Sequence, residues 1–424
     1  MIDALLLTGL ICLAVWATFF VVYYLGLACS YFLTREDVPF VTDLSTRFIV
    51  VIPAHNEELM IAANLKSWSQ VDYPKDRYDI AVIADNCSDN TAEIASALGA
   101  DVITRKDESR KGKGQALAWA FAKIHLKKYD AVVIVDADTV VNNKFLQAMN
   151  ARMRKGASVV QGYDGVLNPN HNAMTRVIWI TNVMKNLLFN HAKSKLGLSV
   201  QLMGTGMCFD SKILEKIGWK GFSKGEDGEQ FAYLAEEGIR VQFEPRAEVF
   251  ADEASSLRQA YTQRFRWVSG RMQLVRLGFL LLFQGLKKRD LYLVDSSLTF
   301  LSPNYVELAN LTIIGFLLSL VVSISGQSVL VAWFAILLLG QFVYFSVGMG
   351  ITDCSLQTIK SLLFVPVFLG WRGMVNILAI LHVRQTTWVR TQRVQSGSTN
   401  EHLKASGSAM EEGTTNSTKF SAGK

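Results

Sequence analysis

Apolar residues gather in two parts of the chain, one at its start and one in its last third. Residues 4–33 carry no charged side chain, and residues 291–383 are again mostly apolar. Between them, residues 34–290 alternate apolar and polar stretches as a soluble domain does. At roughly 1.5 Å per helical residue, the first run exceeds a hydrocarbon core of ~30 Å. The pattern therefore predicts a membrane protein with a folded middle.

The later apolar region divides into three segments. Two of them, 308–325 and 328–350, have the length and composition of membrane spans. The third, 361–383, carries Pro366 and Arg372 inside its apolar run. These two residues are unusual in a membrane span. The basic residues on either side indicate whether the segment crosses the membrane.

Basic residues set the expected orientation, because Lys and Arg favour the cytoplasmic side of short loops. One basic residue, Arg35, follows the first apolar run. Two further clusters flank the three segments: Lys287, Lys288 and Arg289 before them, and His382, Arg384, Arg390 and Arg393 after them. If both clusters are cytoplasmic, an even number of spans separates them. We therefore expect two crossings, with 361–383 at the membrane surface and the folded middle in the cytoplasm.

The chain is thus predicted to be a multi-pass protein of the cell membrane. A cleaved signal peptide needs a basic start, whereas only Asp3 precedes the first run, which favours an uncleaved anchor. Residues 272–285 have a Leu/Phe face and are predicted to form an interfacial helix. The last residues are rich in Ser, Gly, Thr and Asn and are expected to be disordered. The predicted parts are an anchor, a folded domain, a membrane region and a tail, at 1–34, 35–269, 270–394 and 395–424.

The folded middle alternates between apolar runs and helical patterns. The apolar runs are at 48–53, 80–84 and 131–135, and the helical patterns lie near 56–70, 90–98 and 113–128. This alternation predicts an α/β fold with a parallel sheet and helices on both of its faces. Ligands of such sheets bind at the carboxyl ends of the strands. Asp85 and Asp136, which end two of the runs, lie where a ligand is expected.

Composition narrows the class further. The chain has 424 residues, of which 50% are hydrophobic and 19% charged, against about 25% charged in soluble proteins. These values exclude a disordered or collagen-like chain. The net charge of +6 gives no argument for nucleic acid as a partner. Five cysteines and six histidines lack paired spacing, so a bound metal would need oxygen ligands.

The stretch Val132–Val140, VVIVDADTV, joins a buried strand to two carboxylates. In an extended chain, residues two apart point the same way, which would bring Asp136 and Asp138 together. Two such carboxylates suit Mg²⁺ or Mn²⁺ bridging a diphosphate. The alternative is a polar turn in which one aspartate caps the next helix.

Two other strand ends are followed by short polar residues, at 50–58 (VVIPAHNEE) and at 83–91. In residues 83–91, IADNCSDNT, Asp85 can accept hydrogen bonds from a base or ribose, although the residues after it also fit helix capping. Residues 105–114, RKDESRKGKG, contain five basic residues, and Lys113 opens a helix whose N-terminus favours anions. The spacing is not that of a Walker motif. A solvated basic loop is the alternative.

Three later stretches could also carry chemistry. Residues 202–208, LMGTGMC, form a glycine-flanked turn that is more often structural. In KGEDGEQ, Glu226 and Asp227 offer a carboxylate for proton abstraction. The alternative is that this stretch is an acidic turn on the surface. Residues 263–267, QRFRW, combine an arginine that can bind phosphate with a tryptophan that can hold a sugar ring. Arg and Trp also serve as membrane anchors.

In this order, the motifs resemble those of the membrane-embedded family 2 glycosyltransferases, which include cellulose, hyaluronan, chitin and poly-N-acetylglucosamine synthases. The resemblance covers roughly residues 47–393, including Trp388-Val389-Arg390-Thr391 near its end. It implies a GT-A fold, which is Rossmann-like, and transfer with inversion at the anomeric carbon of a nucleotide sugar.

The resemblance also implies roles for residues on the donor side. Glu57 and Asp85 would lie at the nucleoside, and Lys113 near the donor phosphates. Asp138 would coordinate Mg²⁺ or Mn²⁺, with Asp136 beside it near the diphosphate.

On the acceptor side, Asp227 matches the general base of the family, and Gly204 and Thr205 match its acceptor-side turn. Gln263, Arg266 and Trp267 match the motif that holds the diphosphate and the acceptor end. The family often has Thr or Ser before Glu-Asp, where this chain has Gly225. The shape of the loop that carries the base is therefore open.

The resemblance implies a metal-dependent transferase that uses a nucleotide sugar, expected to be a UDP-sugar, beside membrane lipids. The complete QRFRW motif favours a processive polysaccharide synthase with export. Transfer of a single sugar to a lipid carrier is the alternative, because few spans make a narrow channel. A non-enzymatic membrane protein that binds nucleotides is a further alternative, which the joint presence of Asp138, Asp227 and Arg266 disfavours.

Overall fold

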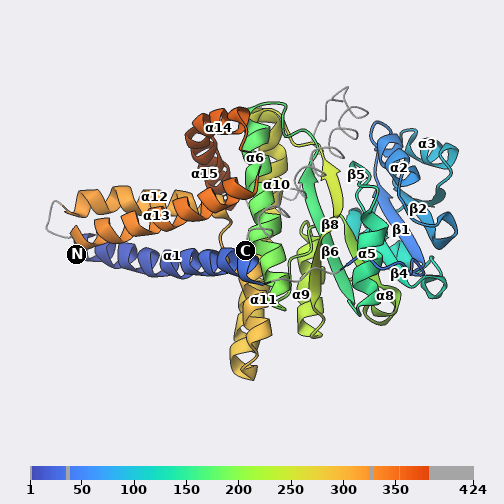
Figure 1. The fold of residues 1–424 in the computed structure, drawn as a ribbon, viewed down its shortest axis with the longest axis horizontal. Coiled ribbons are helices and arrows are strands. Elements are labelled where there is room, and N and C mark those ends of the chain that lie inside the picture. The colour runs from blue at the N-terminus through green and yellow to red at the C-terminus, as the bar shows by residue number, and fades with distance from the viewer. Residues whose placement is uncertain (1, 35–38, 324–327, 353, 382–424) are drawn as a thin grey trace, which may run out of the picture.

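The computed structural model describes residues 2–34, 39–323, 328–352 and 354–381. The predictions for Arg35, for the basic cluster at 382–393, for Trp388–Thr391 and for the tail from 395 lie outside these residues. Figure 1 shows three layers: an α/β domain at one end, a layer of helices in the middle, and a bundle of long helices at the other end.

The α/β domain is built on one sheet of eight strands in the order β3-β2-β1-β4-β7-β6-β8-β5. The strands are β1 Phe48–Ala54, β2 Tyr78–Asp85, β3 Asp101–Arg105, β4 Ala131–Ile134, β5 Thr139–Val141, β6 Val159–Val166, β7 Met207–Asp210 and β8 Val241–Ala251.

The sheet is parallel in one half and mixed in the other, which corrects the prediction of a parallel sheet. β3, β2, β1 and β4 are parallel neighbours, with Phe48 opposite both Tyr78 and Ala131. β7 is antiparallel to β4 and to β6, and β5 is antiparallel to β8, while β6 and β8 are parallel.

Alternating residues of β1 enter two hydrophobic cores, one on each face of the sheet. Val50 and Ile52 pack with Trp68 and Phe145, and Ile49 and Val51 pack on the opposite side. Burial on both faces explains why the parallel strands are almost continuous apolar runs.

Helices cover both faces, as predicted. The first core lies under α2 Ile61–Ser69, α3 Thr91–Ala97 and α5 Phe145–Arg154, and the second under α4 Lys113–Phe121, α8 Ser211–Ile217 and α9 Glu226–Glu236. Short 3-10 turns occur at η1 Lys75–Arg77, η2 Leu126–Lys128 and η4 Leu362–Phe364.

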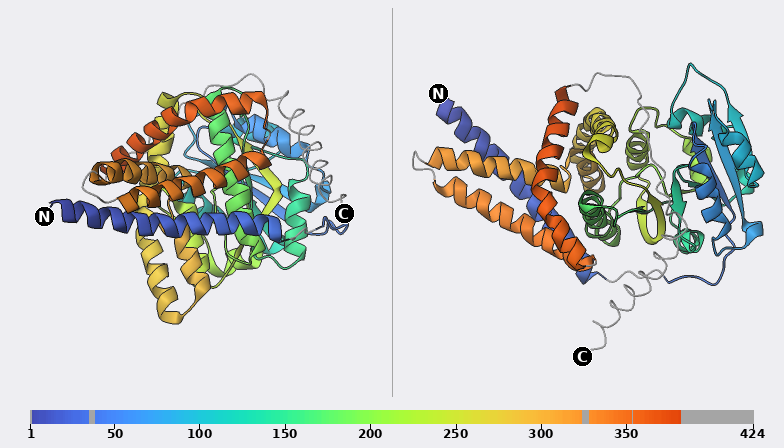
Figure 2. Two further views of the ribbon diagram at one scale, coloured as in Figure 1. Left: turned by 60° about the vertical axis from the view of Figure 1, so that its left-hand side comes forward. Right: turned by 90° about the horizontal axis from the view of Figure 1, so that it is seen from above.

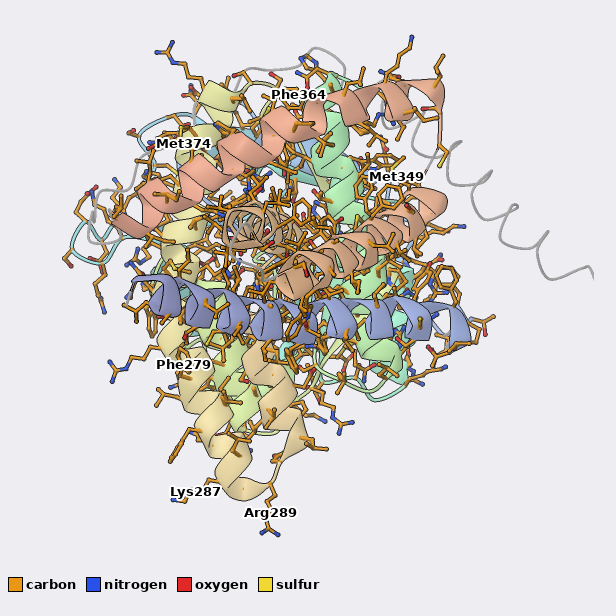
Figure 3. All side chains as sticks on the ribbon, turned by 90° about the vertical axis from the view of Figure 1, so that its left-hand side faces the viewer. Phe279, Lys287, Arg289, Met349, Phe364 and Met374 are labelled. Atoms are coloured by element: carbon orange, nitrogen blue, oxygen red, sulfur yellow. The ribbon has the colours of Figure 1, made fainter. Side chains whose placement is uncertain are left out.

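The middle layer separates the sheet from the bundle. It contains α6 Ala173–Val183, the π-helix η3 Met184–His191, α7 Ala192–Lys195, α10 Leu257–Lys288, α11 Leu291–Leu301, α14 Leu356–Ser361 and α15 Val365–Leu381. α10 is one continuous helix of 32 residues that includes the predicted interfacial stretch 272–285. The predicted boundary between 269 and 270 therefore falls inside a helix. α10 turns back into α11, and Lys287 and Arg289 lie at the tip of this hairpin (Figure 3).

The bundle consists of α1 Ile2–Leu33, α12 Tyr305–Ser323 and α13 Ser328–Ile351. Within the described residues, four segments are long and apolar enough to cross a membrane: Ala4–Leu33, Tyr305–Val322, Ser328–Ile351 and Leu356–Leu381. The last of these passes the test of length and composition, yet α15 runs across α12 and packs against α10 (Figure 2). The surface position of 361–383 stays a prediction.

The bundle is tied to the middle layer by polar contacts at its base. The hydroxyl of Tyr23 on α1 donates to Asp295 Oδ1 at 2.7 Å, and the buried Lys193 lies 2.9 Å from Asp295 Oδ2. Tyr24 donates to the carbonyl of Pro303 at 2.6 Å. These contacts hold α1 against the middle layer of helices.

Candidate active site

The carboxyl ends of β1, β2 and β4 meet at one edge of the sheet because the three strands are parallel and in register. His55, Asp85 and Asp136 follow or end these strands. His55 Nδ1 lies 2.7 Å from the carbonyl oxygen of Asp85, which joins the first two strand ends directly. The sheet edge is therefore polar where the predicted ligand site lies.

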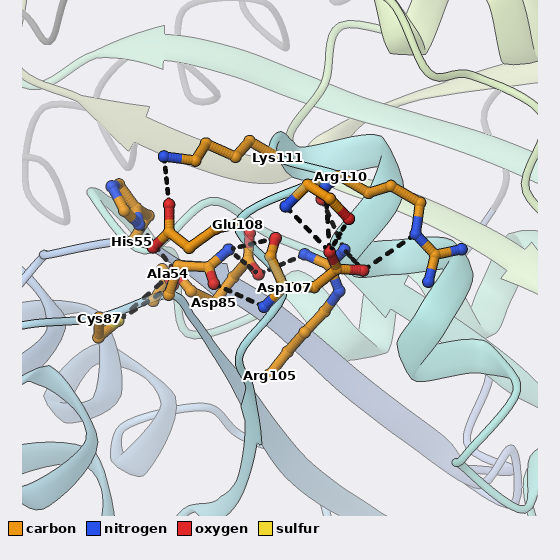
Figure 4. Close-up of polar contacts among 11 residues, drawn as sticks. Ala54, His55, Asp85, Cys87, Arg105, Asp107, Glu108, Arg110 and Lys111 are labelled. Carbon is orange, nitrogen blue, oxygen red and sulfur yellow. Dashed lines mark hydrogen bonds and ion pairs between the residues drawn. The ribbon is translucent and has the colours of Figure 1, made fainter.

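Asp85 is held by Arg105, the first residue of the basic run at 105–114. Asp85 is 6% exposed, and Arg105 Nη1 donates to its Oδ1 at 2.6 Å (Figure 4). Burial raises the pKa of Asp85, and Arg105 opposes that effect. Arg105 also donates to Asp107 Oδ2 at 3.2 Å and to the carbonyl of Arg110 at 2.6 Å. One guanidinium thus fixes both Asp85 and the start of the basic loop.

Lys113 contacts three other predicted motifs, at Asp136, Gly204 and Glu226. Its Nζ lies 2.5 Å from Asp136 Oδ1 and 3.6 Å from Glu226 Oε1, and it donates to the carbonyl of Gly204 at 2.7 Å. Burial opposes the charged form of Lys113, but Asp136 and Glu226 raise its pKa above the usual range. Lys113 is therefore a fixed positive charge among carboxylates.

Asp136 and Asp138 lie in a turn between β4 and β5, which corrects the expectation of an extended chain at this point. The N–H of Asp136 donates to Thr205 Oγ1 at 3.1 Å, and its carbonyl accepts from Asn64 Nδ2 at 3.0 Å. Asp136 points toward Lys113, while Asp138 is half-buried. Thr205 therefore supports the turn that carries Asp136 and Asp138. It is also predicted to lie on the acceptor side.

The turn at 202–206 lies against this cluster, and a buried glutamine that the sequence did not single out shapes it. Gln161 on β6 donates from Nε2 to the carbonyl of Thr205 at 2.8 Å and accepts from the N–H of Met203 at 2.9 Å. Gly204 has a φ of +82°, and a side chain there would lie 3.5 Å from Lys113 Nζ and 3.6 Å from Asp227 Oδ2. Gly204 thus sits between the lysine and the predicted base.

Glu226 and Asp227 open α9 and face the same cluster. Burial raises the pKa of Glu226 to about 7, although Lys113 lowers it. Burial also raises the pKa of Asp227, whose Oδ1 accepts from the N–H of Gly228 at 2.7 Å. The glycine before this pair is explained by α10, because a side chain at Gly225 would lie 2.8 Å from Leu274 Cδ1.

Gln263, Arg266 and Trp267, the predicted site residues of the QRFRW motif, lie on α10, which packs against α9. Gln263 is buried, and its Oε1 has no hydrogen-bond partner among the described residues. Trp267 is 44% exposed, and the guanidinium carbon of Arg264 lies 4.5 Å from the centre of its ring. Arg266 is half-buried on the same helix. α10 thus presents an open aromatic ring near the base-bearing helix.

Glu57, like Asp138, Gln263, Arg266 and Trp267, is not joined to Lys113 by the contacts described above. Its described contact is made by the backbone, whose N–H donates to Thr91 Oγ1 at 2.8 Å. That bond links the end of β1 to the start of α3. The position of Glu57 at the nucleoside remains a prediction.

Comparison with known proteins identifies the family. Residues 46–270 match the sequence profile of glycosyltransferase like family 2. The chain belongs to this family.

Two curated proteins are similar to part of this chain. The chain is 30% identical over 249 residues to the probable glycosyltransferase YdaM of Bacillus subtilis, covering 57% of this chain and 58% of that protein. It is 24% identical over 248 residues to the beta-monoglucosyldiacylglycerol synthase of Trichormus variabilis, covering 56% and 50%. The match thus spans only half to three-fifths of each relative's length.

A solved structure shares the fold. The mannosyltransferase PcManGT from Pyrobaculum calidifontis, in complex with GDP-Man and Mn²⁺, superposes with a TM-score of 0.56 and 16% identity, covering 91% of this chain and all of that chain. The predicted GT-A fold and the assignment as a family 2 glycosyltransferase are confirmed. The narrower resemblance to cellulose, hyaluronan and chitin synthases stays a prediction.

We expect Gly204→Ala to abolish most of the glycosyltransferase activity while costing little more stability than a matched substitution elsewhere. A non-glycine residue at this φ costs roughly 1–2 kcal/mol. Gly238, with a φ of +70° and open space around it, is the control, because Gly238→Ala imposes the same backbone cost at the far end of α9. Thermal unfolding and release of nucleoside diphosphate would be measured for both variants. Equal activity of the two would show that Gly204 serves only the backbone.

Proposed function

We propose that the protein transfers a sugar from a nucleoside diphosphate sugar to an acceptor at the membrane face, with inversion at the anomeric carbon. The observation that carries the proposal is the cluster in which Lys113 contacts Asp136 and Glu226, with Asp227 across Gly204. A fixed cation and a buried carboxylate are the two groups that such a displacement needs from the protein.

The donor would bind along the sheet edge, with its nucleoside toward Asp85 and its diphosphate toward Lys113. The leaving diphosphate gains negative charge as the bond to the sugar breaks, and a preorganised cation stabilises that charge. Lys113 is such a cation because neighbouring carboxylates hold its proton. The backbone of Gly204 restrains its position.

Asp136 and Asp138 fit a divalent metal that the substrate phosphates would also help to hold. Within the described residues there is no group of three or more His, Cys, Asp or Glu side chains that could hold one. Asp136 and Asp138 remain as a pair of hard oxygen donors on one short turn. Magnesium is commonly held by one or two carboxylates together with substrate phosphates. When bound, Mg²⁺ or Mn²⁺ would offset the charge of the diphosphate, and the complex of PcManGT with GDP-Man and Mn²⁺ supports this choice.

Asp227 would remove the proton from the acceptor hydroxyl as that oxygen attacks the anomeric carbon. Burial raises the pKa of Asp227 from its usual value, which makes the carboxylate a stronger base. A base acts only when deprotonated, so activity should fall as the pH drops through its pKa. Glu226 shares this environment and has a pKa raised to about 7. It is the competing candidate for the general base.

Two acceptors are supported by different observations. The half-exposed ring of Trp267 favours a retained sugar polymer, because an aromatic face can hold a pyranose ring. A lipid acceptor is supported by the beta-monoglucosyldiacylglycerol synthase of Trichormus variabilis. In both cases α10 would place the acceptor beside the membrane.

We expect Asp227→Asn to reduce transfer by about 10²–10⁴-fold, the usual contribution of a general base, while donor binding is retained. Glu226→Gln is the matched control and should keep most of the activity at neutral pH. Diphosphate release and the affinity for the nucleotide would be measured in parallel. If Asp227→Asn is active and Glu226→Gln is not, the base is Glu226.

Asp138→Asn should raise the Mn²⁺ concentration needed for half-maximal activity, since it removes one of two charged oxygen donors. EDTA should abolish wild-type activity, and added Mn²⁺ or Mg²⁺ should restore it. Asp79→Asn, at the amino end of β2 and so at the opposite end of that strand from Asp85, is a control for the loss of a carboxylate. Activity that persists in EDTA would contradict the metal assignment.

The size of the product would separate the two acceptors. With membranes, a labelled UDP-sugar or GDP-sugar and no added primer, a polymer acceptor predicts a ladder or a high polymer on a gel. A lipid acceptor predicts one labelled species that extracts into organic solvent. Trp267→Ala should shorten the polymer in the first case.

A further inference from the structure

Arg372 is a buried cation outside the catalytic cluster. It lies on α15, inside the segment Leu356–Leu381, and is 8% exposed. Its Nε is fully buried and has no hydrogen-bond partner among the described residues. Burying a charge without a partner is costly, so a buried arginine without a hydrogen-bond partner beside apolar helices points to a functional site.

The charged side chains that act on Arg372 leave it without a free counterion. They are Arg264 and Arg271 on α10, Glu253 before it and Glu307 on α12. Each carboxylate is already paired: Arg264 Nη2 lies 2.9 Å from Glu253 Oε2, and Arg271 Nη1 lies 2.7 Å from Glu307 Oε2. We call these five residues the Arg372 cluster. With three guanidinium groups and two carboxylates, it carries one excess positive charge.

The remaining oxygen of Glu307 is also engaged. Asn376, one turn after Arg372 on α15, lies 3.4 Å from Glu307 Oε1 through its Nδ2. Arg271 Nη2 donates to the carbonyl of Ser302 at 2.6 Å. Both carboxylates are therefore held by other partners, and neither forms an ion pair with Arg372.

The cluster lies at the level where lipid headgroups are expected. Glu307 is in the first turn of α12, from which the apolar helix runs away from the α/β domain (Figure 1). The outer face of α15 is apolar and exposed at Val367, Met374 and Ile377, and Met374 is visible in Figure 3. Basic pockets between membrane helices bind lipid headgroups in this way.

We propose that the Arg372 cluster binds the phosphate headgroup of a membrane lipid, with the acyl chains along the outer face of α15. A guanidinium binds phosphate through two parallel hydrogen bonds, and the anion removes the excess charge. A neutral sugar cannot do so, which separates this site from the carbohydrate side of the acceptor site. The binding site does not depend on which sugar or acceptor the enzyme uses.

The test compares two lipids that differ only in the phosphate. Binding of phosphatidic acid and of the diacylglycerol with the same acyl chains to the purified full chain in detergent is measured by native mass spectrometry. A charged hydrogen-bonded pair predicts about ten- to hundredfold tighter binding of phosphatidic acid. Equal binding of the two lipids overturns the proposal. Inorganic phosphate that competes as strongly as phosphatidic acid shows a site for free phosphate and overturns the lipid assignment.

Variants locate the site. Arg372→Gln should remove the preference for phosphatidic acid, and Arg372→Lys should retain part of it. Arg289→Gln makes the same charge change at the exposed tip of the α10–α11 hairpin and should leave the preference unchanged. If Arg372→Gln does not fold, the comparison of the wild type with Arg372→Lys decides. Unchanged preference in a folded Arg372→Gln variant overturns the assignment to Arg372.

Discussion

The ion pair between Lys113 and Asp136 is the contact on which the catalytic edge depends. Asp136, Glu226 and Asp227 come from separate parts of the chain and converge in a partly buried space. Burial of like charges raises their pKa values and would favour neutral carboxyls or separation of the loops. The ammonium group of Lys113 offsets that effect and, through the carbonyl of Gly204, also fixes the opposite turn. One cation therefore stabilises the site, and the proposed binding of a diphosphate would use the same charge.

α10 connects this site to the membrane region. The helix carries Gln263, Arg266 and Trp267 near α9 and continues without a break into the hairpin with α11. Leu274 packs into the space left by Gly225, so the position of the base-bearing loop and that of α10 depend on each other. Tyr23 and Lys193 meet at Asp295 on α11 and tie the same hairpin to α1. The distance between the catalytic edge and the long helices is thus set by packed helices rather than by a flexible linker.

Charge is handled differently in the two polar regions of the molecule. At the catalytic edge, the Lys113 cation lies among carboxylates, 2.5 Å from Asp136 Oδ1 and 3.6 Å from Glu226 Oε1. Around Arg372, two complete ion pairs leave one guanidinium in excess beside apolar helices. The first arrangement suits a nucleotide with its metal, and the second suits an anion without one. Both lie next to α10.

The sequence by itself determined the apolar strands, the aspartates at their ends, the membrane-length segments and the order of the motifs. These features follow from local burial and periodicity, which neighbouring residues encode. Only the tertiary structure decided that β7 runs antiparallel, that Asp136 lies in a turn, that Arg105 holds Asp85 and that Gln161 shapes the turn at Gly204. It also decided that Arg372 is the arginine left over between two pairs. The partners are distant in the chain: Arg105 is 20 positions from Asp85, and Gln161 is 44 positions from Thr205. No local pattern specifies such a partner before the chain has folded.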